Sequence, residues 1–290
     1  MLGGRLTDFV AFWPGTQSKM QRVTIKYLKD EDRSERIRCN IHDTLRRKDW
    51  LARLIPQASG GEVGIICGGP SLGSFVEDIR QRQRGGMKLL ATNGAHDYLV
   101  EKKIQPDFAA SMDHRAENAA FYKTPAAGTI YLIASRCHPL VYEALEGMDV
   151  RVWHAMADDE ADAEEDILGP DVNMIGGGST IGSRALYIAI LMGFKRFHFF
   201  GLDSCLLGDE HHAYPQPWND GKRVLRVLIG PDPGGRVFYC HEWMVAQYEE
   251  MRRIFQKIHG GETPEVEDIQ VHGPGLIAQM IRHNIEAVPA

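Results

Sequence analysis

The best candidate for chemistry is a glycine-rich turn that follows the apolar run Val63–Cys67. The turn consists of Gly68, Gly69, Pro70 and Ser71. Glycine has no Cβ, so this backbone can turn sharply and approach a ligand closely. Ser71 is placed to cap a following helix, whose free N–H groups favour a phosphate or another anion. The turn predicts either a phosphate-binding loop or a tight structural connection. It lacks the lysine of a P-loop and the glycine pattern of a dinucleotide site, which disfavours a P-loop NTPase and a standard NAD site.

Further polar clusters follow other apolar runs. They are Asn93-Gly94, Asp113-His114-Arg115, Gly176-Gly177-Gly178-Ser179-Thr180, and Asp203 with the later His211 and His212. Asparagine and aspartate suit a ribose or base, and aspartate also suits a metal ion. Three glycines before two hydroxyls favour a second anion cradle. A loop histidine can act as a general base near neutral pH. For each cluster a turn, a helix cap or a plain surface role stays open.

Seven apolar runs are the predicted strands that position these residues. They are Val63–Cys67, Lys88–Thr92, Phe108–Met112, Thr129–Ala134, Val150–His154, Val172–Ile175 and Arg196–Gly201. Helical patterns lie between several of them, at Ala95–Lys103, Pro139–Leu145 and Ser179–Met192. This alternation predicts an α/β, Rossmann-like, doubly wound and mostly parallel sheet. Because ligands bind outside the carboxyl ends of such strands, we expect the polar clusters to converge on one rim.

The flanks differ from this central domain, which we place at residues 61–215. Residues 1–60 are charged, with a helical pattern over Asp43–Ile55, and we expect an N-terminal extension that packs on the domain. Residues 216–290 are expected to complete the domain. Their predicted elements are a hairpin of Val224–Ile229 and Arg236–Cys240, a helix over Glu242–His259, a strand at Ile269–His272 and a closing helix. The acidic run Asp158–Asp166 is interpreted as a solvated surface, with metal binding or a lid as alternatives.

Composition narrows the classes of function. The chain has 290 residues, 43% hydrophobic and 25% charged, as in ordinary globular proteins. Its net charge of −6 argues against a nucleic-acid polymer as partner. No run approaches the ~20 apolar residues of a membrane span, and the first residues lack the pattern of a signal peptide. Five scattered cysteines without a Cys-x-x-Cys pair predict a cytoplasmic protein.

Several motifs occur in an order that resembles one known family. They are residues 65–72, Ala91–Asn93, Pro106–Phe108, Ser111–Asp113, and Gly178-Ser179 through Gly201–Asp203. Together they resemble the 6-hydroxymethylpterin pyrophosphokinase-like (MptE-like) domains, a family that also covers the core of bacterial motility accessory factors linked to flagellin glycosylation. The Gly-Pro-Ser turn and residues 193–203 are also similar to bacterial sialyltransferases that use a CMP-linked nonulosonic acid. The resemblance extends over residues 62–215.

The resemblance implies roles for the strand-end residues. The turn at residues 68–71 would line the nucleotide phosphate or ribose, Asn93 and Asp113 would lie by the nucleoside, and residues 178–180 would lie near the donor. His211 or His212 would be the general base, with Asp203 as a further catalytic candidate. The tyrosines that hold the phosphate leaving group in the sialyltransferases have Tyr214 and Tyr239 as candidate substitutes.

Three functions stay open. The favoured one is a glycosyltransferase-like transferase in surface-glycan or protein glycosylation, with a nucleotide-sugar donor, a glycan or small-molecule acceptor and no required metal. The second is a pyrophosphokinase that takes a nucleoside triphosphate, in which Asp113 and Asp203 would hold Mg²⁺. The third is a non-catalytic nucleotide- or glycan-binding module. Assembly into a homo-oligomer also stays open.

Overall fold

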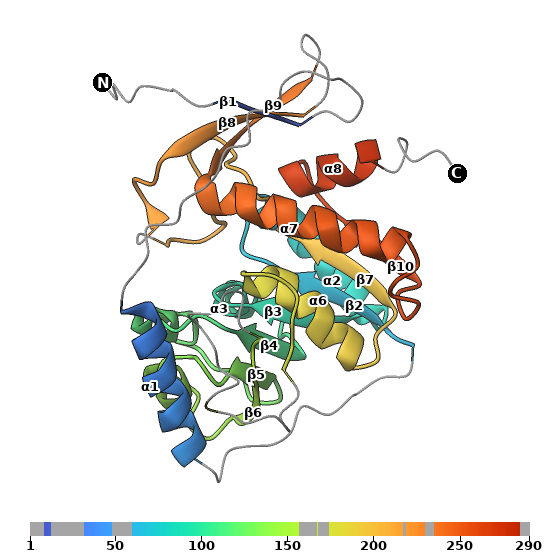
Figure 1. The fold of residues 1–290 in the computed structure, drawn as a ribbon. Helices are drawn as coiled ribbons and strands as arrows, with labels where there is room; N and C mark the ends of the chain where they lie inside the picture. Colours follow the sequence, from blue (N-terminus) through green and yellow to red (C-terminus); the bar gives the residue numbers. More distant parts are fainter. Residues whose placement is uncertain are drawn as a thin grey trace.

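The computed structural model describes residues 9–12, 32–47, 60–156, 167, 174–216, 219–229 and 235–284. Its large sheet contains β2 (Glu62–Ile66), β3 (Lys88–Thr92), β4 (Phe108–Ser111), β5 (Ile130–Ala134), β6 (Asp149–Trp153), β7 (Arg196–Phe200) and β10 (Asp268–Val271). Every pairing in this sheet is parallel. The strand order is β10-β7-β2-β3-β4-β5-β6 (Figure 1). The predicted Rossmann-like α/β fold is confirmed.

Helices cover both faces of this sheet. They are α1 (Arg33–Arg46), α2 (Val76–Arg84), α3 (Ala95–Glu101), α4 (Pro139–Ala144), α6 (Ile181–Leu191), α7 (Glu242–His259) and α8 (Leu276–Asn284), with 3₁₀ helices η2 (Pro70–Phe75) and η3 (Ala116–Phe121). The helices α6, α7 and α8 pack on one face, and α2 and α3 pack on the other (Figure 1). No helix in this described set is both long and apolar enough to cross a membrane.

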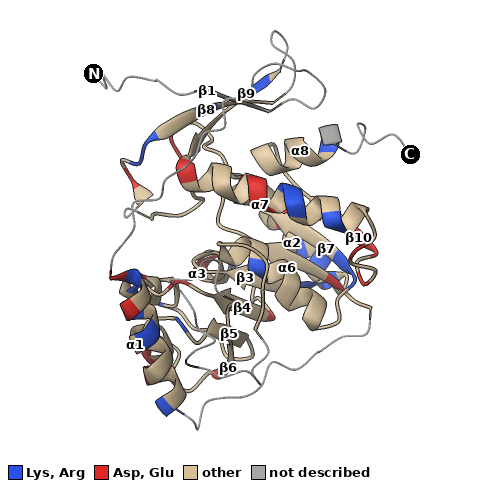
Figure 2. Ribbon diagram, in the orientation of Figure 1, with Lys and Arg blue, Asp and Glu red and all other residues tan. Residues whose placement is uncertain are grey.

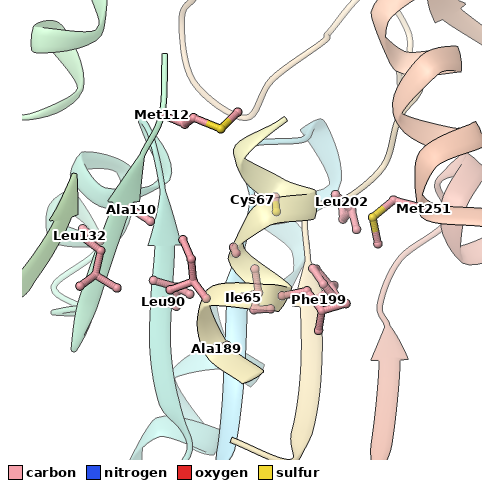
Figure 3. Close-up of a cluster of buried hydrophobic side chains, with 14 of the residues drawn as sticks. Ile65, Cys67, Leu90, Ala110, Met112, Leu132, Ala189, Phe199, Leu202 and Met251 are labelled. Atoms are coloured by element: carbon pink, nitrogen blue, oxygen red, sulfur yellow. The ribbon is translucent and has the colours of Figure 1, made fainter. Parts of the chain in front are cut away.

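The strands in the middle of the sheet are mostly apolar because both faces of the sheet are covered, and the charged residues of β2, β3 and β7 stand at their first positions. Along β2, Ile65 joins the core beneath α6 while the next residue, Ile66, joins the core beneath α2 and α3. Figure 3 shows Ile65, Leu90 and Phe199, from three neighbouring strands, around Ala189 of α6. Charges lie mainly on helices and loops, and the central strands are almost free of them (Figure 2). The sheet is therefore a rigid support for the loops at its ends.

One of the seven predicted strands, Val172–Ile175, is not a strand of the sheet. Residues 171–173 lie outside the described residues, and Ile175 forms only an isolated bridge with Ala155, beyond the edge strand β6. The seventh place is taken at the opposite edge by β10, which pairs with β7 in parallel. The other predicted strands agree with the observed ones to within one residue at each end.

The flanking regions add a second sheet. Strand β1 (Phe9–Phe12) pairs in parallel with β8 (Val224–Ile229), which forms the predicted hairpin with β9 (Arg236–His241). The strand β1 had no counterpart in the sequence prediction. The predicted helix Asp43–Ile55 is wrong in its start, because α1 already begins at Arg33. Its residues 48–55, like the acidic run Asp158–Asp166, lie outside the described part of the chain.

The order of the strands creates a switch point between β2 and β7. The chain starts the sheet at β2, adds β3 to β6 on one side, and then adds β7 and β10 on the other. Loops that leave β2 and β7 at their carboxyl ends consequently diverge from a common crevice. In open α/β sheets this crevice is where ligands bind.

Candidate functional site

A cavity of about 530 Å³ lies at this carboxyl edge, a volume that suits a small-molecule ligand. Loops after β2, β3, β4, β5 and β7 line it, together with the starts of α6 and α7 and residues from the segments 211–216 and 219–222. Most of the predicted site residues are among the lining residues, namely Gly68, Gly69, Pro70, Asn93, Asp113, Ser179, Thr180, Asp203, His211 and His212. Ser71 and Gly178 are not. Most of the predicted site residues therefore converge on one cavity, and their functional roles stay predictions.

The floor of the cavity is the contact between the turn after β2 and the loop after β7. The Gly69 N–H donates to the Gly201 carbonyl at 2.8 Å, and the Ser71 N–H donates to Asp203 Oδ2 at 2.9 Å. A Cβ on Gly69 would lie 2.5 Å from Asp203 Oδ2, so only glycine fits there. The predicted capping role of Ser71 is wrong: Ser71 is buried inside η2, and its N–H is taken by a carboxylate 132 residues away.

Asp203 is enclosed beneath the cavity and is only 2% exposed. Its backbone carbonyl accepts the N–H of Leu276 at the start of α8, and a Cβ on Gly275 would lie 2.7 Å from Oδ1. Burial raises the pKa of Asp203, while the hydrogen bond from the Ser71 N–H opposes that rise. Through these contacts Asp203 connects the turn after β2, the end of β7 and the start of α8. Its catalytic role stays a prediction.

Asn93 and Asp113 extend the floor toward β4. Asn93 has a left-handed φ of +49°, and its Oδ1 accepts the hydroxyl of Ser111 at 2.9 Å, so its amide nitrogen is left to donate elsewhere. Asp113 accepts the Arg115 side chain on both carboxylate oxygens. Burial favours its neutral form, yet the bonds from Arg115 hold the pKa of Asp113 below its usual range. Asp113 is therefore an ionised carboxylate already matched by a guanidinium.

The predicted second cradle already holds a protein carboxylate. The Ser179 N–H donates to Glu250 Oε2 at 3.0 Å. Thr180 caps α6 by accepting the Ser183 N–H, and its hydroxyl also accepts the Gln247 side-chain amide at 2.8 Å. A donor phosphate could accept a hydrogen bond from the Ser179 N–H only after the Glu250 carboxylate has moved away from it. The placement of residues 178–180 near the donor stays a prediction.

The two histidines lie together on the opposite wall. Their Nδ1 atoms are 2.7 Å apart, and His211 Nε2 is 2.8 Å from Asp220 Oδ1. The ring of His212 is stacked on Trp243, with ring centroids 6.0 Å apart. Burial, followed by the neighbouring His211 and His241, lowers the pKa of His212 to about 3. His212 is therefore neutral at physiological pH, with one ring nitrogen that carries no proton.

Of the two candidate tyrosines, only Tyr214 lies at the cavity. The Ala213 N–H donates to the Gly68 carbonyl at 3.0 Å, which fixes this segment against the turn, and a Cβ on Gly68 would collide with the Tyr214 hydroxyl. Tyr239 lies on β9, is 47% exposed and is not a lining residue. Tyr214 is thus the remaining candidate to hold a phosphate, whereas the place of Tyr239 does not support that role.

Basic side chains also line the cavity, and of these the sequence analysis named only Arg115. They are Arg33, Arg115, Arg136 and Lys222, against Asp113 and Asp203 as the acidic residues of the described lining. This local excess of positive charge is opposite to the net charge of the chain and suits an anionic ligand. Arg136 follows β5 just as the other clusters follow their strands, so its position was a usable signal. Arg33 had none.

Helix α1 brings Arg33 to the cavity through long-range contacts. The side-chain amide of Asn40 donates to the carbonyls of His114 and Arg136, both at 3.0 Å, and the Thr44 hydroxyl donates to the Ser135 carbonyl. Asn40 and Thr44 lie on the buried face of α1. The helix is consequently fastened to the two loops that carry lining residues after β4 and β5.

The two aspartates that the kinase alternative assigned to Mg²⁺ already have hydrogen-bond partners in part. Mg²⁺ needs oxygen ligands free to coordinate it, but Asp113 is bound by Arg115 and Asp203 Oδ2 by the Ser71 N–H. Across the described residues no three His, Cys, Asp or Glu side chains are grouped as metal ligands. Oδ1 of Asp203 is buried without a hydrogen-bond partner among the described residues, so the metal-holding role of the two aspartates stays a prediction.

The sheet and its helices define an α/β domain of the doubly wound class, with a cavity at the carboxyl edge of its strands. The sequence matches the family model described as "6-hydroxymethylpterin diphosphokinase MptE-like" over residues 39–209, which is 171 of 290 residues. The chain therefore belongs to the MptE-like family, as predicted. Among solved structures, the MAf glycosyltransferase from Magnetospirillum magneticum AMB-1 has a similar fold, with a TM-score of 0.58 and 18% identity. That similarity covers 87% of this chain but 38% of the other. No curated protein matches.

Proposed function

We propose that this chain is a glycosyltransferase-like enzyme that transfers a sugar from a nucleotide donor, with a CMP-linked nonulosonic acid as the favoured donor. The observation that carries the proposal is the cavity itself. It places a glycine turn at the switch point, a surplus of basic side chains and a neutral histidine around one small-molecule volume. Membership of the MptE-like family supports nucleotide chemistry, and the similar fold of a MAf glycosyltransferase is consistent with sugar transfer.

The proposed reaction uses the two walls of the cavity in different ways. The Gly68–Pro70 backbone and the basic side chains hold the nucleotide, and Tyr214 stabilises the phosphate. One histidine accepts the proton of the acceptor hydroxyl. The acceptor oxygen forms a bond to the anomeric carbon, and the bond from that carbon to the phosphate oxygen breaks. The electron pair of that bond leaves with the nucleoside monophosphate, whose negative charge the basic groups offset.

The state of the two aspartates favours this transfer over the diphosphokinase alternative. A diphosphokinase requires Mg²⁺ to bridge the phosphates of ATP. Asp113 is engaged with Arg115 and Oδ2 of Asp203 with Ser71, which leaves Oδ1 of Asp203 as the oxygen without a hydrogen-bond partner in the described part of the chain. The family description keeps that alternative worth testing. A binding module without catalysis would bind nucleotide and turn over nothing.

Two assays separate these functions. Isothermal calorimetry against CMP, CDP, CTP, ATP and GTP is expected to show binding of the cytidine nucleotides, and absence of heat with all five would contradict the proposal. Hydrolysis of CMP-N-acetylneuraminate is then followed with EDTA or with added Mg²⁺. We expect equal release of CMP in both. Turnover of ATP that depends on Mg²⁺ would favour the kinase, and binding without any turnover would favour the module.

A further inference from the structure

Three side chains form a continuous hydrogen-bonded chain from the surface into the cavity. It runs from the Asp220 carboxylate through both ring nitrogens of His211 to Nδ1 of His212, with contacts of 2.8 Å and 2.7 Å. The Asp220 side chain is 68% exposed, whereas that of His211 is 11% exposed. His212 Nδ1 is thus engaged, and Nε2 is the ring nitrogen left for a ligand.

The proton positions along this chain follow from its two ends. An ionised carboxylate can only accept, so the Asp220 contact requires a proton on Nε2 of His211, and we take this as the single proton of that ring. Its Nδ1 then carries a lone pair and must accept. The proton of His212 is consequently on Nδ1, and the Nε2 atom of His212 is left as a base. Such an arrangement, in which a carboxylate fixes the tautomer of a histidine, is the logic of the catalytic triads.

The Nε2 edge of His212 lies where the proposed reaction needs a base. A Cβ built on Gly68 would lie 3.1 Å from His212 Cδ2, the ring carbon bonded to Nε2. The edge therefore faces the turn at the switch point, beside the hydroxyl of Tyr214. The side chain at residue 68 must be absent for this approach, which gives Gly68 a second reason to be glycine.

We propose that Asp220 and His211 are positioning residues that hold His212 in its Nδ1–H tautomer, so that Nε2 of His212 is the general base. This assignment rests on the proposed function for its chemistry. The acceptor hydroxyl gives its proton to Nε2, its oxygen bonds to the anomeric carbon, and the sugar–phosphate bond breaks toward the nucleotide. The proton then leaves the imidazolium for solvent.

The other groups around the pair are compatible with this assignment. His241 approaches the His211 ring to 6.1 Å between ring centroids, and its Nδ1 lies 2.9 Å from the Arg223 carbonyl, to which it can only donate. Tyr214 and Trp243 flank His212, and burial raises the pKa of the Tyr214 hydroxyl. None of the described neighbours supplies a second carboxylate to His212, so the proton order depends on Asp220.

The test is the proton position on each ring, measured by long-range ¹H–¹⁵N correlation spectra of protein labelled at histidine. We expect Nδ1–H for His212 and Nε2–H for His211 near neutral pH. Asp220→Ala is expected to shift His212 toward the Nε2–H form that free histidine favours, and Asp220→Glu to restore the wild-type pattern. The matched control is Asp209→Ala, which removes an exposed carboxylate from the same loop. A wild-type His212 protonated on Nε2, or a spectrum unchanged in Asp220→Ala, would overturn the assignment.

These spectra need no substrate, so their result does not depend on whether the proposed transferase function is correct. Where CMP-N-acetylneuraminate is hydrolysed, Asp220→Ala is expected to lower kcat about tenfold while KM changes little. Wild-type spectra as expected, with no hydrolysis of any donor, would retain the relay and reject the transferase. Hydrolysis that is unchanged in Asp220→Ala would retain the transferase and reject the relay.

Discussion

The two walls of the cavity differ in origin and in chemistry. The family wall consists of the lining residues within the matched region 39–209, such as Gly68, Asn93 and Asp203. The outer wall consists of Arg33 and the lining residues after 209, such as His212 and Lys222. The family wall combines backbone turns and buried hydrogen bonds with charged residues such as Asp113 and Arg136, whereas the outer wall adds the aromatic rings of Tyr214 and Trp243 beside its ionisable groups. Under the proposed function, the family wall would supply most contacts to the nucleotide, and the outer wall would supply the base together with further phosphate contacts.

The largest effect is expected from removing the base on the outer wall. His212→Asn should lower CMP-N-acetylneuraminate hydrolysis by about 10²–10⁴-fold, because the acceptor proton has no positioned base. Calorimetric affinity for CMP should stay within about threefold, since no charge is lost from a neutral ring. His259→Asn, at the exposed end of α7, is the control. Equal loss of binding and turnover would mean that the walls do not divide the work.

Glycine 69 tests the family wall. A Cβ there meets both the Gly201 carbonyl and Asp203 Oδ2, so Gly69→Ala must push the turn away from β7. We expect a loss of about 1–3 kcal/mol in the free energy of unfolding, measured by denaturant titration, and loss of CMP binding. Gly176→Ala, whose Cβ would lie 3.6 Å from Met156 Sδ, is the control for stability. Unchanged stability and affinity in Gly69→Ala would contradict this view of the turn.

Buried histidines predict how stability depends on pH. Burial is the main cause that lowers the pKa of His212 to about 3 and those of His114 and His272 to about 4. Below the ordinary value of 6.5 the unfolded chain therefore binds more protons, so stability falls as pH falls from 6.5 toward 4. Each group contributes up to about 1.4 kcal/mol per pH unit. The raised pKa of Asp203 acts in the opposite direction at the acid end.

Denaturant titrations between pH 7.5 and pH 4.5 measure this slope. His114 is the most informative single site, because its Nε2 is buried without a hydrogen-bond partner among the described residues. His114→Gln should flatten the slope, and His259→Asn should not. A wild-type stability that stays level down to pH 4.5 would show that these rings are not desolvated as described.

The smallest effect is expected from the exposed rim of the outer wall. Lys222→Gln should weaken CMP binding about two- to fivefold at low salt, with the difference vanishing in high salt because exposed charges are screened. The matched control is Lys195→Gln, at the amino end of β7, where Lys195 pairs with Glu267. A large effect that persists in high salt would place Lys222 in direct contact with the ligand.

The sequence predicted the family wall better than the outer wall, for a physical reason. Strands buried on both faces are continuous apolar runs, and their carboxyl ends share one edge, so Asn93, Asp113 and Asp203 could be grouped without coordinates. The prediction that Ser71 caps a helix was wrong. Ser71 lies inside η2, and its N–H donates to Asp203, which is distant in the sequence. The prediction also failed at Val172–Ile175, where Ile175 forms only an isolated bridge with Ala155, whereas the predicted strand at Ile269–His272 is present as β10.

The residues of the outer wall are positioned by long-range contacts that no local sequence pattern predicts. Arg33 reaches the cavity because Asn40 fastens α1 to two distant loops. The sequence showed the pair His211 and His212. It did not show which ring nitrogens carry the protons, because the proposed proton positions depend on Asp220, nine residues after His211. Periodicity predicts which face of an element is buried, and it carries no information about which side chain a loop will meet.

The most direct test of the central claim is a crystal structure of the protein with CMP. We expect the phosphate of CMP to lie beside the turn of Gly68 and Gly69, within reach of the Tyr214 hydroxyl and of Nε2 of His212. The ribose of CMP is expected near Asn93. Electron density for CMP at any other place on the molecule, or CMP in the cavity with its phosphate directed away from His212, would contradict it.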